Sequence, residues 1–86
     1  MNTKLNYETI CKELVEFVQS QIVAEGIELN KFTILNSIGI DSFSLIEIVL
    51  FIERQYGIVI SDESLIPENL KSIDTIALTI IQQLKA

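Results

Sequence analysis

Apolar side chains recur at intervals of three and four residues in three stretches of the chain, which is the spacing of one face of an α-helix. The first stretch runs from about Thr3 to Glu25, with Asn6 able to cap a shorter version and Gly26 placed to end it. The second runs from Ser42 to about Tyr56, and the third follows Ser72, which we expect to be its N-cap. The pattern therefore predicts three amphipathic helices.

The second predicted helix has clear signals at both ends. Asp41 precedes it and can accept hydrogen bonds from the free backbone N–H groups of the first turn, where the helix dipole favours a negative charge. Gly57 follows it and can adopt the left-handed conformation that ends a helix. We therefore expect this helix to begin at Ser42 and to end just before Gly57.

The helical spacing separates positions that face a core from positions that face solvent. The predicted core positions are Tyr7, Ile10, Cys11, Leu14, Val15, Val18 and Ile22 in the first helix, Leu45, Ile46, Ile48, Val49, Ile52 and Tyr56 in the second, and Ile73, Ile76, Ala77, Ile80, Ile81 and Leu84 in the third. The opposite side of the second helix carries Phe43, Glu47, Leu50 and Arg54, with Phe51 beside them. Because large apolar groups alternate with charges there, we predict that this side binds a partner. The alternative is that the long loop before Asp41 folds over Phe43 and Leu50 and buries them.

The connections between the helices differ in character. In residues 27–40 the apolar side chains follow neither the helical spacing nor the alternation of a strand for more than a few positions. We therefore predict a long ordered loop there, held by the apolar side chains of Ile27, Leu29, Phe32, Leu35 and Ile38. Residues 58–60 are extended but have no strand to pair with, and Pro67 is placed to open a one-turn helix through Leu70. The predicted fold is all-α, with three main helices, one short helix and a long first loop around one core, in one domain over residues 1–86.

The composition narrows the possible functions. The 86 residues contain no histidine and one cysteine, which excludes Ser-His-Asp and Cys-His catalysis and histidine-containing zinc sites. Cys11 lies on the apolar face, where we expect it to pack, and a single cysteine forms no internal disulfide, which suits a reducing compartment. Neither a signal peptide nor a stretch approaching the ~20 apolar residues of a membrane span is evident. We therefore expect a cytoplasmic protein.

The negative charge is concentrated in the middle of the chain. The net charge is −6, and residues 38–70 contain six acidic side chains and one basic one. Such a surface repels nucleic acids and anionic membranes and favours basic protein partners, although it could also serve only to keep a small protein in solution. We expect a monomer that binds neither nucleic acid nor membrane.

Ser42 is the residue best placed for chemistry. A phosphate on its hydroxyl would face the unpaired N–H groups of the first helical turn and the positive end of the helix dipole, which stabilise an anion by about 0.3–1 kcal/mol. Ser42 is therefore suited to carry a phosphodiester. The same position also suits an ordinary first-turn residue without any chemical role.

Four segments of the chain occur in a characteristic order and spacing. They are Gly39-Ile40-Asp41-Ser42 at the head of the second helix, Leu45-Ile46-Glu47-Ile48-Val49 within it, Tyr56-Gly57-Ile58 at its end, and Asn69 to Ile76 before the third helix. Over essentially its whole length the chain resembles the acyl carrier and peptidyl carrier protein family. The resemblance implies the four-helix bundle of the acyl-carrier type and a carrier that is not itself an enzyme.

The resemblance also implies a cofactor and partners. A phosphopantetheinyl transferase would attach 4′-phosphopantetheine from coenzyme A to Ser42, and the thiol of this arm would hold acyl or aminoacyl groups as thioesters. Asp41 matches the aspartate that helps to position the region for the transferase. The other partners would be acyl- or aminoacyl-loading and processing enzymes with basic docking patches. The positions that would contact them are Phe43, Glu47, Leu50, Glu53 and Arg54.

Some positions depart from the family pattern. Phe43 stands where leucine is usual, Ser44 where fatty-acid carriers often have an acidic residue, and Arg54-Gln55 where an acidic stretch is common. These departures favour a discrete carrier of a polyketide, nonribosomal peptide or specialised fatty acid or lipid pathway. The alternative is an unmodified acidic helical module that docks on a basic protein. An enzyme with Ser42 as its nucleophile is disfavoured because no histidine base is available.

Overall fold

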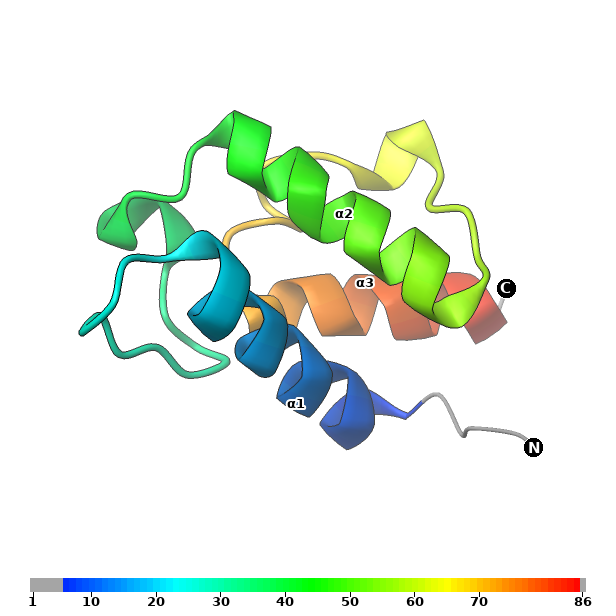
Figure 1. Cartoon of the computed structure of the whole chain (residues 1–86). Coiled ribbons are helices and arrows are strands. Elements are labelled where there is room, and N and C mark those ends of the chain that lie inside the picture. The colour runs from blue at the N-terminus through cyan, green and yellow to red at the C-terminus, as the bar shows by residue number, and fades with distance from the viewer. Residues whose placement is uncertain (1–5, 86) are drawn as a thin grey trace.

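The helices that the apolar spacing predicts are all present. The computed structural model describes residues 6–85, which form α1 (Tyr7–Phe17), α2 (Ser42–Tyr56) and α3 (Ile73–Lys85). Figure 1 shows α1 and α2 running in opposite directions, with the long connection between them gathered at one end of the molecule. No strand occurs within this range, so the all-helical fold with a long first loop is confirmed. No helix in the same range combines the length and apolar character needed to cross a membrane.

The first helix begins where its capping residue predicts, but it does not end at the predicted residue. The Asn6 side chain accepts a hydrogen bond from the Thr9 N–H at 2.8 Å, and the predicted start at Thr3 lies outside the described residues. After Phe17 the chain continues as a wider π-helix (Val18–Ile22) and turns extended at Val23. The predicted end at Gly26 is therefore wrong, because Ile22 and the extended Val23 both pack against the core and the chain leaves the helix there.

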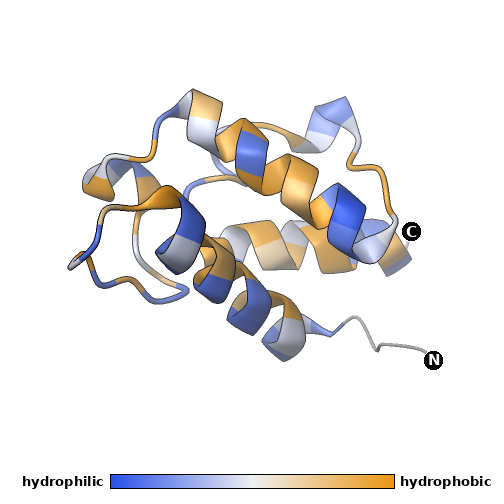
Figure 2. Ribbon diagram, viewed as in Figure 1, coloured by the Kyte–Doolittle hydropathy of each residue, from blue (hydrophilic) through white to orange (hydrophobic). Residues whose placement is uncertain are grey.

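The core lies between the three helices and is aliphatic. Its most deeply buried large side chains are Ile10, Leu14, Val18, Leu35, Ile48, Ile52, Ile73 and Ile80. Most predicted core positions are buried or packed against this cluster. Two are not: the Ile46 side chain is 57% exposed, and Leu84 in the last turn of α3 is also exposed. Figure 2 shows that hydrophobic and hydrophilic residues alternate along α2.

The long connection is ordered by contacts with α1 and α3. Leu35 is buried at the start of a short 3₁₀ helix (Leu35–Ile38), and its N–H donates to the Lys71 carbonyl at 2.8 Å. The Asp74 N–H donates to the Lys31 carbonyl at 2.7 Å. Leu29 and Ile38 pack against the core as predicted, but Phe32 is exposed. Backbone hydrogen bonds to the start of α3 thus hold this loop together with its apolar side chains.

Side chains add a second attachment of the loop to the helices. The Lys31 ammonium lies 4.6 Å from the centroid of the Tyr7 ring and 3.8 Å from the Glu8 carboxylate. The Tyr7 hydroxyl donates to the Asp74 carboxylate, and this bond raises the pKa of Tyr7 above its ordinary value. Burial raises the pKa of the neighbouring Cys11 thiol, in keeping with the packing role expected for Cys11.

The segment between α2 and α3 differs in one respect from the prediction. Gly57 ends α2 with a left-handed φ of 67°, as expected. A short 3₁₀ helix spans Asp62–Ser64, while residues 67–70 form a hydrogen-bonded turn and not the predicted one-turn helix. The Leu70 N–H is shared at 3.2 Å between the carbonyls of Ile66 and Pro67, and no further helical bond follows. Ser72 then caps α3 by accepting from the Thr75 N–H at 3.2 Å.

Candidate functional site

Ser42 is held at the surface by its neighbours in the chain. Gly39 ends the short 3₁₀ helix with a left-handed φ of 88°, a conformation that a side chain would strain. The following Ile40 is 4% exposed, and its N–H donates to the Leu35 carbonyl at 3.2 Å. Because Ile40 is anchored in the core, the chain emerges at Asp41, and Ser42 begins α2 with its side chain exposed.

Asp41 caps the helix that Ser42 begins, as the sequence predicts. Its backbone is extended, and its carboxylate accepts from the Ser44 N–H at 2.9 Å. This hydrogen bond lowers the pKa of the Asp41 carboxyl below its usual value, because it favours the charged form. Asp41 thus holds the first turn of α2 in place and leaves the Ser42 side chain directed to solvent.

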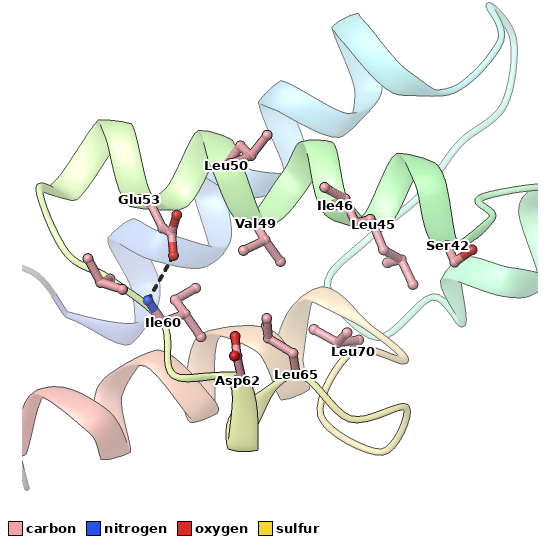
Figure 3. A pocket seen from close by; sticks show the side chains of 11 residues that line it. Ser42, Leu45, Ile46, Val49, Leu50, Glu53, Ile60, Asp62, Leu65 and Leu70 are labelled. Atoms are coloured by element: carbon pink, nitrogen blue, oxygen red, sulfur yellow. Dashed lines mark hydrogen bonds between the residues drawn. The ribbon is translucent and has the colours of Figure 1, made fainter.

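An apolar groove begins at Ser42 and follows α2 along the side that faces the α2–α3 connection (Figure 3). We call it the Ser42 groove; its volume is about 470 Å³. It is lined by Ser42, Leu45, Ile46, Val49, Leu50, Glu53, Val59, Ile60, Asp62, Leu65 and Leu70. Ile46 is exposed because it forms a wall of this groove, which corrects its assignment to the core. Helical spacing does not distinguish a core position from the wall of a groove.

Glu53 closes the groove at the end away from Ser42. Its carboxylate accepts from the Ile60 N–H at 2.9 Å, a contact that Figure 3 marks with a dashed line. The bond holds the extended segment after Gly57 against α2. The groove wall formed by Val59, Leu65 and Leu70 was not found by sequence reasoning. The sequence signal for this wall is that the connection between α2 and α3 contains apolar residues that lie on the face of none of the three main helices.

Four of the residues predicted to bind partners line two hollows beside α2. Phe43 is 72% exposed and Leu50 is 43% exposed, so both lie outside the core as predicted. Glu53 lines the Ser42 groove, whereas Glu47 and Arg54 line a different hollow on the α1 side of α2. Leu50 lines both and forms the ridge between them.

Phe51 differs from its predicted place on the exposed side of α2. Its ring is half-buried and stacks on the Phe17 ring, with the centroids 4.1 Å apart. The apolar spacing of α2 alone did not reveal this contact because the partner ring belongs to α1. Phe51 is therefore a packing residue that links the two helices and only borders the exposed surface.

Comparisons with known proteins identify a family and a fold for this chain. A family model described as a phosphopantetheine attachment site matches residues 12–80. A search of curated proteins found no match. Among solved structures, a similar chain occurs in the complex of the Bradyrhizobium japonicum glycine:carrier protein ligase with its cognate carrier protein and an analogue of glycyl adenylate. The TM-score is 0.70 at 19% identity, over 90% of this chain and 97% of that chain. This likeness confirms the predicted fold.

Proposed function

The chain belongs to the phosphopantetheine attachment site family, and from this premise we propose that Ser42 is the residue to which 4′-phosphopantetheine is attached. Domains of this family carry that prosthetic group and act as carriers. The observation that supports Ser42 most directly is its exposed position at the first residue of α2, beside the mouth of the groove. Coenzyme A and a phosphopantetheinyl transferase are the corresponding donor and enzyme.

The residues around Ser42 fit such a group. The start of α2 offers backbone N–H groups and the positive end of the helix dipole to a phosphodiester. The groove beside it offers apolar walls of Leu45, Ile46 and Val49. When bound, the group supplies a terminal thiol that holds an acyl or aminoacyl group as a thioester. Asp41 keeps the first turn of the helix formed, and Ile40 keeps Ser42 directed outward.

We propose that loading and processing enzymes dock on the exposed side of α2. Phe43, Glu47 and Leu50 combine exposed apolar surface with negative charge there, which suits an enzyme surface with basic groups around an apolar contact. The carrier protein of the Bradyrhizobium complex is bound to a ligase that acts on glycine, and we propose an acyl- or aminoacyl-loading enzyme as the equivalent partner of this chain. Phe43, Ser44 and Arg54 favour a polyketide, nonribosomal peptide or specialised lipid pathway.

Intact mass spectrometry tests the attachment site. The chain is incubated with coenzyme A and a transferase of broad specificity, in parallel with Ser42→Ala, Ser37→Ala and Ser44→Ala. We expect the mass increment of phosphopantetheine in the original chain and in the Ser37 and Ser44 variants, and none in Ser42→Ala. Because Ser42 is exposed, the free energy of unfolding of Ser42→Ala should lie within about 0.5 kcal/mol of that of the original chain.

Two outcomes would contradict the proposal. If Ser42→Ala still gains the mass of phosphopantetheine, the group is attached to another residue. Absence of any increment in the original chain, while a known carrier in the same reaction is modified, would favour the unmodified interaction module.

A further inference from the structure

The wall of the Ser42 groove that lies opposite α2 contains three residues outside any helix, which we call the 59–61 segment. Val59 and Ile60 line the groove, and the Ile60 side chain is 6% exposed. Peptide groups beside a buried side chain need hydrogen-bond partners, and an extended segment ordinarily finds them on a neighbouring strand. No strand is present among the described residues, so the partners of this segment come from elsewhere.

Two side chains take the place of a neighbouring strand, one on each side of the segment. The Gln83 carboxamide of α3 donates to the Val59 carbonyl at 2.6 Å and accepts from the Ser61 N–H at 3.1 Å. The Glu53 carboxylate of α2 accepts from the Ile60 N–H at 2.9 Å (Figure 3). Successive peptide groups of an extended chain point to opposite sides, so the two side chains hold the segment from α3 and from α2.

The chemistry of glutamine suits this contact. A carboxamide carries an acceptor oxygen and donor N–H groups in one plane, so it can pair with a carbonyl and an N–H that point to the same side of a chain. A residue on a parallel strand would pair with the same two groups through its own backbone. An ionised carboxylate, an ammonium group or an aliphatic side chain does not offer both a donor and an acceptor. The contact therefore depends on the residue type at position 83.

The place of the 59–61 segment sets the width of the Ser42 groove, because Val59 and Ile60 form part of its wall. The Val59 side chain is 78% exposed, so little apolar burial holds this end of the wall. The backbone contacts of Gln83 flank Ile60 on both sides, at Val59 and at Ser61. Gln83 is thus placed to fix the wall although it does not line the groove itself.

We propose that Gln83 is a positioning residue of the Ser42 groove, which holds the 59–61 segment in place and so keeps a phosphopantetheine arm on Ser42 aligned along the groove. The identity of the arm rests on the proposed function, whereas the hold on the segment does not. Because Gln83 acts through the backbone of another segment, its loss should leave Ser42 open to modification while the arm becomes less ordered.

Amide hydrogen exchange of the unmodified chain tests the hold on the segment. In Gln83→Leu we expect the Ser61 and Ile60 amides to exchange about two- to tenfold faster, because the segment has lost two hydrogen bonds. Gln83→Glu keeps an acceptor for the Ser61 N–H but loses the donor, so its rates should lie between those of Gln83→Leu and the original chain. Gln82→Leu, at the exposed neighbouring position of α3, is the matched control and should leave both rates unchanged. The amide of the fully buried Ile52 in α2 serves as the reference for general loss of stability.

Amide spectra of the modified chain test the positioning of the arm. The ¹⁵N-labelled chain is modified with coenzyme A and a transferase, and its signals are compared with those of the unmodified chain. We expect the arm to shift the signals of Val49 and Leu65 in the original chain and in Gln82→Leu, and most of these shifts to be lost in Gln83→Leu. Intact mass spectrometry should show that both variants are fully modified. A residue that only stabilised the fold would leave the shifts of the folded molecules unchanged.

Three outcomes would overturn the proposal, and they separate its failure from that of the proposed function. If the Ile52 amide is accelerated in Gln83→Leu as much as the Ser61 amide, Gln83 stabilises the whole fold and not the wall. If the arm is attached but shifts Val49 and Leu65 equally in the original chain and in Gln83→Leu, the proposed function stands and Gln83 does not position the arm. If no arm is attached to the original chain, the proposed function fails and the positioning of the arm fails with it.

Discussion

The rings of Phe17 and Phe51 stack almost parallel, with centroids 4.1 Å apart and an interplanar angle of 14°, and so join α1 to α2 across the surface of the bundle. Stacked aromatic pairs contribute beyond the area that they bury, and this pair connects residues from two helices that local sequence does not bring together. Both rings also line the hollow on the α1 side of α2.

A double-mutant cycle measures this contact. Phe17→Leu and Phe51→Leu keep an apolar side chain but remove the ring, and the two effects should not add. We expect a coupling free energy of about 0.5–1.5 kcal/mol in chemical denaturation. Phe43→Leu, at an exposed position of the same helix, serves as the control and should show no coupling to Phe17→Leu. Simple additivity for Phe17 and Phe51 would show that the stack does not contribute to stability.

The exposed apolar residues of α2 should affect binding more than folding. We expect Phe43→Ala and Leu50→Ala each to lower the free energy of unfolding by less than about 1 kcal/mol. Ile52→Ala in the same helix empties a fully buried position and should cost about 2–5 kcal/mol. Affinity for the transferase or a loading enzyme should fall by about 1–2 kcal/mol in the Phe43 and Leu50 variants. Losses of several kcal/mol of stability with unchanged affinity would assign both residues to the core.

The cap of α2 should make stability depend on pH in a defined direction. The pKa of Asp41 is lowered in the folded chain by its hydrogen bond with the Ser44 N–H, so its contribution is present above the ordinary aspartate pKa of about 3.9 and is lost as the pH falls through the lower folded value. Asp41→Asn keeps a side-chain acceptor for the cap but removes the charge.

The measurement for Asp41 is the free energy of unfolding of both chains as a function of pH. We expect the original chain to be the more stable near neutral pH and the difference to shrink as the pH falls below about 4. A difference that stays constant over this range would mean that the charge of Asp41 does not stabilise the helix.

Association with enzymes should slow as the salt concentration rises. Residues 38–70 carry six acidic side chains and one basic one, and a basic enzyme surface would be steered towards them. The Debye length falls from about 10 Å at 0.1 M salt to about 3 Å at 1 M, which screens this attraction. Stopped-flow measurement of binding to the transferase should show a falling association rate, and a smaller salt dependence for Glu47→Gln. A rate that is flat across the range would argue against steering.

The features that the sequence predicted correctly are mainly those whose interactions lie within a few residues along the chain. Asn6 bonds to Thr9, Asp41 to Ser44 and Ser72 to Thr75, each three residues away, and Gly57 ends α2 through its own backbone conformation. Such caps depend on local geometry alone. The place of Ser42 at the head of α2 follows from the same local signals, so the sequence alone was enough to predict where the candidate attachment site lies.

The features that only the tertiary structure decided depend on what lies opposite a residue in space. Ile46 and Ile48 are both isoleucines of α2, yet Ile48 faces the core and Ile46 forms a groove wall because no segment covers it. Phe51 is half-buried because Phe17 of α1 meets it, and the helix before Gly26 ends early because Val23 packs against the core. Periodicity gives the direction of a side chain around its helix axis, but burial is set by the neighbouring segments, and these are brought together only when the whole chain folds.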